Sequence, residues 1–218
     1  MDTVIFDFDG TLADTQESII STMAETMRVL GIHDADAAVM KSMIGLPLRE
    51  GIRRAAGIED ENMLDDAVAL YRKIYKDMAP HTIKLYPGVK DTLESLAAGG
   101  YRLAVATSRG KDSLRQMLDV LGIAHLFCVL KADEDVINKK PAPDMVRAIL
   151  SELNCQSSEA MMVGDTTFDI EMGNGAGVKS CGVTYGNHSR RQLTEADADY
   201  VIDSITELIP LVEDNSRI

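Results

Sequence analysis

The 218-residue chain has no tryptophan, few other aromatic residues and only three cysteines. Cys128, Cys155 and Cys181 lie far apart and form no CxxC or Cys/His spacing, so we expect neither a zinc site nor a disulfide framework. No apolar run approaches the length of a membrane span, and the N-terminus leads directly into an acid-bearing apolar segment. We therefore expect a cytoplasmic protein without a signal peptide or membrane anchor.

Basic residues are also scarce. The sequence has 22 Lys and Arg against 35 Asp and Glu, which gives a formal net charge of -13 and a pI of about 4.7. A field of this sign argues against a nucleic-acid partner or an anionic membrane surface. If the substrate is an anion, its site needs local cations, and we expect a divalent metal, a lysine and some arginines there.

Apolar segments alternate with amphipathic ones along most of the chain. This pattern predicts a parallel, doubly wound α/β sheet with a Rossmann-like core. The expected strands cover residues 3–8, 102–106, 127–130, 160–163, 179–183 and 200–202. The expected core helices cover residues 89–98, 111–121, 143–153, 169–174 and 205–212.

The region after the first strand breaks this alternation. Its periodicity predicts four successive helices, at 16–31, 35–43, 48–56 and 61–78, with no convincing strand between them. We therefore expect a helical domain, residues 15–84, inserted into a core made of residues 1–14 and 85–218. We expect the connections to lie at 13–15 and 83–87 and to act as hinges.

Chemically complementary side chains stand where the predicted strands end. Functional residues of such sheets collect beyond the carboxyl ends of the strands. Each residue has an ordinary reading by itself, as a helix cap, a turn residue or a surface lysine. Their joint occurrence favours one site. The candidates in chain order are Asp7, Asp9, Thr107, Lys140, Asp165 and Asp169.

Together these groups suit phosphoryl transfer. Asp7, Asp165 and a backbone carbonyl would suit Mg²⁺, which prefers oxygen ligands. A carboxylate can attack phosphorus to give an aspartyl-phosphate, while a hydroxyl and an ammonium, from Thr107 and Lys140, hold the phosphoryl oxygens. Asp9 would face the same side as Asp7 and is free to exchange a proton with the leaving group.

Four segments at these positions, 7–12, 106–108, 140–144 and 164–170, resemble the four motifs of the haloacid dehalogenase superfamily. The match runs in order along nearly the whole chain, and the helical insertion stands where that family carries its cap. The sequence is most similar to the phosphoglycolate phosphatase-like and β-phosphoglucomutase-like group with a helical cap. The resemblance implies a phosphatase that hydrolyses the phosphomonoester of a small metabolite.

The resemblance also implies roles for individual residues. Asp7 is the implied nucleophile and Asp9 the implied acid/base. Mg²⁺ is bound by Asp7, the main-chain carbonyl of Asp9 and Asp165, while Thr107 and Lys140 bind the phosphoryl group. Asp169 is expected to orient Lys140 or a metal-bound water from a second layer.

Further candidates for contacting the substrate lie in or beside the motifs and in the insertion. Gly10 lies in the first motif, Ser108 ends the second and Arg109 follows it, and Ser108 and Arg109 would touch the leaving group. Residues 44–50 resemble the cap loop that faces the substrate, where Arg49 would meet a carboxylate, phosphate or hydroxyl. Arg53, one helical turn further on, would share that face.

Other functions remain open at this point. A phosphoglucomutase of the same build would pass the phosphoryl group to a sugar hydroxyl. A receiver domain also combines acids, a hydroxyl and a lysine, but the Asp-x-Asp on the first strand and the long insertion disfavour it. A true haloacid dehalogenase needs no acid at the position of Asp9, and a non-catalytic relative needs none of these groups. We expect a monomer or a weak homodimer.

Overall fold

The computed structural model describes residues 1–32, 37–42, 44, 46–78 and 82–215. Its centre is a six-stranded parallel sheet with the strand order β5-β4-β1-β6-β7-β8. The strands are β1 (Thr3–Phe6), β4 (Arg102–Ala106), β5 (Val129–Lys131), β6 (Ala160–Gly164), β7 (Lys179–Val183) and β8 (Tyr200–Ile202). The predicted doubly wound α/β fold is confirmed.

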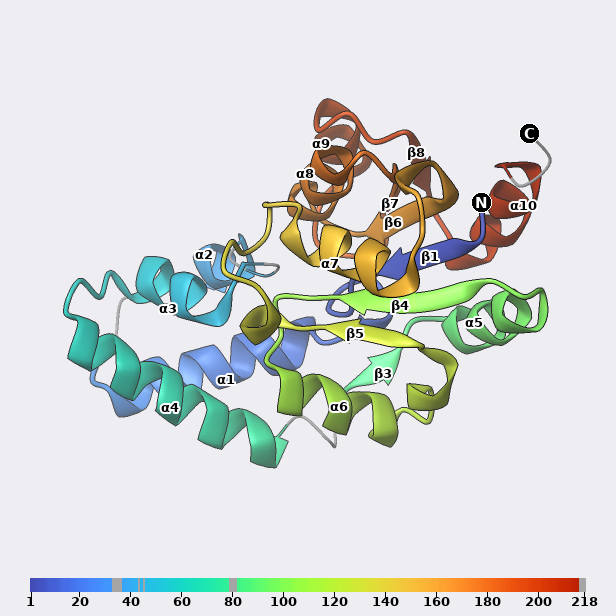
Figure 1. Cartoon of the computed structure of the whole chain (residues 1–218). Helices are drawn as coiled ribbons and strands as arrows, with labels where there is room; N and C mark the ends of the chain where they lie inside the picture. Colours follow the sequence, from blue (N-terminus) through green and yellow to red (C-terminus); the bar gives the residue numbers. More distant parts are fainter. Residues whose placement is uncertain (33–36, 43, 45, 79–81, 216–218) are drawn as a thin grey trace.

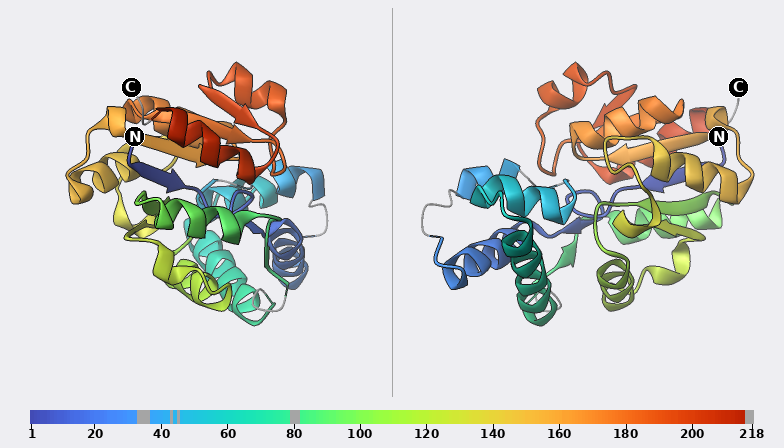
Figure 2. Two further views of the ribbon diagram at one scale, coloured as in Figure 1. Left: turned by 90° about the vertical axis from the view of Figure 1, so that its right-hand side faces the viewer. Right: turned by 60° about the vertical axis from the view of Figure 1, so that its left-hand side comes forward.

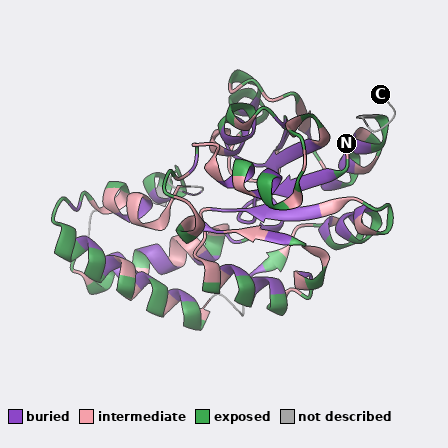
Figure 3. Cartoon of the chain, viewed as in Figure 1, coloured by how far each residue is buried: buried purple, intermediate pink, exposed green. Residues whose placement is uncertain are grey.

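The residues of the central strands are buried, as Figure 3 shows. Strand β1 is buried along its whole length because helices cover both sides of it, which explains its continuous apolar run. Val4 and Phe6 belong to one core cluster, whereas Ile5 belongs to a second cluster on the opposite face. This alternation follows from the two-residue period of a strand.

Helices complete the two outer layers of the core (Figures 1 and 2). Helices α7 and α8 supply the cluster that contains Ile5, while α5, α6 and α10 supply apolar side chains to the cluster that contains Val4 and Phe6. The core helices are α5 (Val89–Ala98), α6 (Lys111–Val120), α7 (Asp144–Leu153), α8 (Thr167–Ala176), α9 (Arg190–Glu195) and α10 (Leu208–Asn215).

Four further helices form what we call the helical insert. They are α1 (Gln16–Val29), α2 (Ala37–Ser42), α3 (Leu48–Ala56) and α4 (Glu61–Met78). The two chain crossings between the insert and the core are paired as a short antiparallel ribbon, in which Ala13 of β2 (Ala13–Asp14) lies opposite Leu85 of β3 (Lys84–Leu85). Because the crossings lie side by side, the insert is attached to the core at one place.

The structure also shows where the periodicity was insufficient. Strands β2 and β3 have two residues each, too few to display a period, and helix α9 has only six. The strand predicted at 127–130 is β5, which begins two residues later, at Val129, and follows a short 3-10 helix at Ala124–Leu126. Part of the predicted helix 35–43 lies outside the described residues. No helix in the described ranges is long and apolar enough to cross a membrane.

Helix α8 lies against the sheet through a glycine. A β-carbon at Gly173 would stand 2.9 Å from the Cβ of Met162 on β6 and 3.6 Å from the Cβ of Ser180 on β7. The sheet atoms belong to two central strands and have little room to move. This close approach sets the height of α8 above the sheet.

We predict that Gly173→Ala destabilises the protein by about 1–2 kcal/mol. Overpacking against β6 and β7 costs about 1–3 kcal/mol, and the better helix propensity of alanine recovers up to about 1 kcal/mol. Gly175→Ala is the matched control in the same helix, because its β-carbon would meet Pro143 at an ordinary 3.4 Å. The control should be neutral or slightly stabilising in urea unfolding. Equal effects at the two positions would contradict this packing.

Candidate active site

Three acidic side chains meet at the carboxyl ends of the central strands. Asp7 follows β1, Asp165 follows β6, and Asp169 lies in the first turn of α8. All three are buried, and one carboxylate oxygen from each lies within 4.8 Å of the others. The structure thus brings together acids that are 158 and 162 positions apart from Asp7 in the chain.

Lys140 stands between two of these acids. Its Nζ donates to Oδ1 of Asp7 and to Oδ1 of Asp169, both at 2.6 Å. Burial by itself would lower the pKa of Lys140, but the two carboxylates raise it, so the ammonium form is retained. The contact between Lys140 and Asp169 is one of the two alternatives expected from the sequence.

The cluster carries more negative charge than one lysine can balance. Three carboxylates and one ammonium leave two formal negative charges in excess. Burial, together with the neighbouring acids, raises the pKa of Asp7 well above its usual value, although Lys140 opposes this. Burial and the charge of Asp169 raise the pKa of Asp165 to about 7. A divalent cation with a preference for oxygen fits this donor set, because it would offset the excess charge.

Hydrogen bonds orient the acids from outside the cluster. Oδ2 of Asp165 accepts from the backbone N and from Nδ2 of Asn187, both at 2.7 Å, and its Oδ1 accepts from Oγ1 of Thr11 at 3.1 Å. Oδ2 of Asp169 accepts from the backbone N of Thr166 at 3.0 Å and from its Oγ1 at 2.7 Å. Donors therefore fix both oxygens of Asp165, while at Asp169 they fix Oδ2 and leave Oδ1 to Lys140.

Glycines make room for this arrangement. Gly10 has a φ of +88°, and a β-carbon there would overlap the carboxylate of Asp165. A β-carbon at Gly164 would overlap Asp169 in the same way. Gly10 was expected to touch the substrate, but what the structure shows is its close approach to Asp165.

Asp9 and Thr107 lie at neighbouring strand ends. Oγ1 of Thr107, which follows β4, accepts from the backbone N of Arg109 at 3.2 Å. The guanidinium of Arg109 forms an ion pair with both carboxylate oxygens of Asp9, and Nε reaches Oδ2 at 3.0 Å. Arg109 was expected at the leaving group. The structure places its guanidinium on Asp9, where the side chain also lines the cavity.

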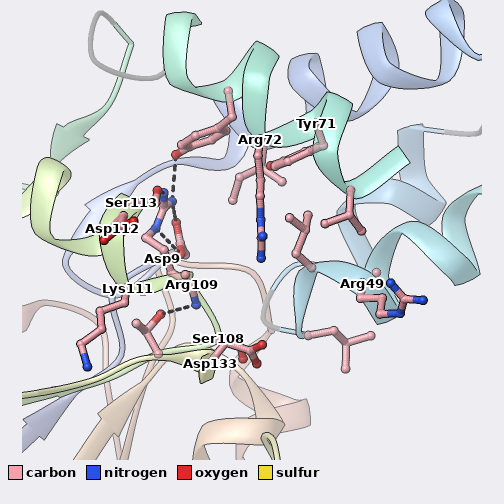
Figure 4. Close-up of a pocket in the computed structure, with 18 of the residues that line it drawn as sticks. Asp9, Arg49, Tyr71, Arg72, Ser108, Arg109, Lys111, Asp112, Ser113 and Asp133 are labelled. Atoms are coloured by element: carbon pink, nitrogen blue, oxygen red, sulfur yellow. Dashed lines mark hydrogen bonds and ion pairs between the residues drawn. The ribbon is translucent and has the colours of Figure 1, made fainter. Parts of the chain in front are cut away.

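A cavity of about 870 Å³ opens between these strand ends and the helical insert (Figure 4). Asp7, Asp9, Thr107, Ser108 and Arg109 line it from the core. The insert contributes apolar and aromatic side chains, as is usual for small-molecule sites. Its lining residues include Ile19, Met23, Met40, Ile44, Val68, Tyr71 and Tyr75.

Two arginines of the insert line the cavity differently. Arg72 extends from α4 into the cavity in Figure 4, and its side chain is 63% exposed. Arg49, the cap residue expected at the substrate, directs its guanidinium to Asp65 and Glu61 of α4. Arg53 also binds Glu61, at 2.6 Å.

Sequence reasoning missed several residues of the site. Arg72 and Tyr75 lie on a helix whose relation to the core could not be known beforehand. Asn187 lies in the loop after β7, so the rule that placed the other candidates at strand ends would have reached it. It was overlooked because an isolated amide carries little signal among turn residues.

Known proteins resemble this chain in sequence and in fold. Residues 4–183 match the family model described as haloacid dehalogenase-like hydrolase. The chain belongs to this family. The predicted family and the prediction of a hydrolytic enzyme are confirmed.

Individual relatives span nearly the whole chain. The chain is 34% identical to "Probable phosphatase IndB" of Dickeya dadantii over 94% of its own length and 91% of the relative. It is 32% identical to "Pyrophosphatase PpaX" of Halalkalibacterium halodurans over 100% and 99%. A solved structure described as a "predicted phosphatase" from Clostridium acetobutylicum is 28% identical, with a TM-score of 0.88 and 98% coverage of both chains.

We predict that Lys140→Met destabilises the metal-free protein by about 3–5 kcal/mol, because it leaves Asp7 and Asp169 buried without a cation. Lys139→Met at the adjacent position is the control. Lys139 pairs with Asp133 at a partly exposed site, where about 0–1 kcal/mol is expected. Urea unfolding in a mildly alkaline buffer with a chelator measures both. A Lys140 effect no larger than the control would show that the buried ion pairs are unimportant for stability.

Proposed function

We propose that the protein is a Mg²⁺-dependent phosphatase that hydrolyses the phosphomonoester of a small metabolite through an aspartyl-phosphate on Asp7. The observation that carries the proposal is the setting of Asp7. Its carboxylate lines the cavity, contacts the ammonium of Lys140 and belongs to the acidic cluster. Membership of a hydrolase family with phosphatase-named relatives supports the same reaction class.

The reaction proceeds in two displacements at phosphorus. A carboxylate oxygen of Asp7 attacks phosphorus, and the bond from phosphorus to the leaving oxygen breaks. Asp9 donates its proton to that oxygen, so that a neutral alcohol departs. In the second half, Asp9 takes a proton from water, the water oxygen attacks phosphorus, and the bond to Asp7 breaks. Inorganic phosphate leaves, and both aspartates return to their starting state.

The remaining groups hold charge in place. Thr107 and Lys140 stabilise the non-bridging oxygens of the phosphoryl group. Asp7, Asp165 and the main-chain carbonyl of Asp9 would hold the metal, with Asp169 behind them. When bound, Mg²⁺ reduces the repulsion between the attacking carboxylate and the phosphate dianion. Asn187 and Thr11 keep the carboxylate of Asp165 directed toward that position.

The insert determines which phosphates enter. We infer that residues 15–84 act as a cap domain that moves about the β2–β3 ribbon and that its inner surface selects the leaving group. Arg72 reaches into the cavity and would favour leaving groups with an anionic or polar end. A phosphate-release screen over small phosphorylated metabolites, with and without Mg²⁺, tests this proposal.

We predict different consequences for the two acids of the first motif. Asp7→Asn should abolish turnover, because the amide cannot attack phosphorus. For the same reason, no phosphoenzyme should be detected after acid quench. Asp9→Asn should lower turnover of alkyl phosphates by about 10²–10⁴-fold, the usual contribution of an acid/base group. Its phosphoenzyme should still form with p-nitrophenyl phosphate, whose leaving group needs no proton.

Rapid acid quench followed by mass spectrometry of the intact chain measures both variants. Ser158→Ala, at an exposed position far from the cavity, serves as the control and should behave as wild type. Substantial turnover by Asp7→Asn, or identical behaviour of the two aspartate variants, would contradict these roles.

We predict that saturating Mg²⁺ raises the thermal unfolding midpoint of the wild-type protein, because the cation relieves the excess charge of the cluster. At about 100 times its dissociation constant the stabilisation is about 2.7 kcal/mol. Asp165→Asn should lose most of this shift, whereas Asp66→Asn, on the exposed side of α4, should keep it. A full shift in Asp165→Asn would place the metal elsewhere.

A further inference from the structure

Arg109 has no clear part in the reaction described so far, yet it is among the most thoroughly bonded side chains near the cavity. Its side chain is 6% exposed. All three of its side-chain nitrogens donate hydrogen bonds, and the three partner residues come from different parts of the chain. The partners are Asp9 after β1, Ser113 in α6 and Tyr75 in α4.

The ion pair with Asp9 fixes a plane. Nε donates to Oδ2 at 3.0 Å, and a terminal nitrogen donates to Oδ1, so the guanidinium holds both oxygens at once. A two-point contact of this kind restricts rotation of the carboxylate, which a single lysine contact would not do. The side chain of Asp9 is 12% exposed, and the pair is therefore only weakly screened by solvent.

Two aromatic rings hold the guanidinium from its sides. Its central carbon lies 4.9 Å from the ring centre of Tyr75 and 5.2 Å from that of Phe8. Tyr75 also stacks on Tyr71 at 5.7 Å, one turn earlier in α4. The hydroxyl of Tyr75 accepts from Arg109 at 2.8 Å. Tyr75 therefore acts on Arg109 through both its ring and its hydroxyl.

This arrangement crosses from the core to the insert. Asp9 and Arg109 belong to the core, but Tyr75 belongs to the insert, whose two chain connections to the core pair as the β2–β3 ribbon. A displacement of α4 must either carry Arg109 with it or break the bond to Tyr75. The position of the insert is thereby linked to the orientation of the Asp9 carboxylate.

We propose that Arg109 is a positioning residue for Asp9 and that Tyr75 makes this positioning depend on the placement of the helical insert. The inference rests on the proposed function, in which Asp9 transfers the proton to the leaving group. The insert then has a second role besides selecting the substrate: through Tyr75 and Arg109 it restricts the rotation of the Asp9 carboxylate.

Tyr75→Phe is the decisive variant, because it keeps the ring and removes only the hydroxyl bond to Arg109. We expect kcat for an alkyl phosphate to fall about tenfold, in proportion to one hydrogen bond to a charged group. For p-nitrophenyl phosphate, kcat should fall less than about twofold, because its leaving group needs no proton from Asp9. KM should change little with either substrate.

Asp77→Asn is the matched control. It changes an exposed side chain of the same helix, two residues from Tyr75 and outside the cavity lining, and leaves the three partners of Arg109 in place. Its kcat should match wild type with both substrates. A second variant, Arg109→Lys, keeps the charge but loses the two-point contact, and it should show the same dependence on the leaving group as Tyr75→Phe, with a larger fall.

Asp9→Asn, measured with the same two substrates, distinguishes the proposed role of Asp9 from the positioning role of Arg109 and Tyr75. If Asp9→Asn loses activity equally with both substrates, the proposed role of Asp9 fails. If Asp9→Asn depends on the leaving group but Tyr75→Phe and Arg109→Lys do not, only the positioning role is overturned. A rise in KM at unchanged kcat in these two variants would also overturn it, since Arg109 would then serve substrate binding.

Discussion

The contact of one buried ammonium with two buried carboxylates is the constraint on which the rest of the site depends. Lys140 holds Asp7 and Asp169 at 2.6 Å each, and all three side chains are almost completely removed from water. Such a cluster is costly to bury, and its cost falls only when each charge has a partner. The excess of negative charge that remains explains why a divalent metal suits the site. The contacts of Lys140 with Asp7 and Asp169 also determine how closely β1, α8 and the loop before α7 approach one another.

The fold meets this requirement through small residues and backbone donors. Gly10 and Gly164 leave space for Asp165 and Asp169, and Gly173 lets α8 lie low on the sheet. The carboxylates of Asp165 and Asp169 keep their orientation because backbone and side-chain donors bind their Oδ2 atoms. Glycines that take no part in the proposed reaction thus determine whether the acidic side chains can come together.

Much of the core site was predictable because parallel strands end at one edge of a sheet. That rule placed Asp7, Thr107 and Asp165 together from the alternation of apolar segments alone. The charged segment that carries Lys140 followed from chemical complementarity. What could not be predicted depends on how the insert packs on the core. The hydrogen bond between Tyr75 and Arg109 joins two elements whose relative placement leaves no trace in local periodicity.

The insert therefore contributes more than a cover for the cavity. Its α4 supplies the aromatic side chains on one wall, the exposed Arg72, and the hydroxyl that holds Arg109. In the proposed function, substrate selection and acid/base geometry are joined in one helix, while the groups that act on phosphorus belong to the core.

In the proposed mechanism, phosphorus is attacked twice, first by Asp7 and then by water. The stereochemical course of hydrolysis tests this with a phosphorothioate ester made chiral at phosphorus by sulfur, 16O and 18O and hydrolysed in 17O-labelled water. Each in-line displacement inverts the configuration. Two displacements predict overall retention in the released chiral thiophosphate. Overall inversion would show a single attack by water and would contradict the role given to Asp7.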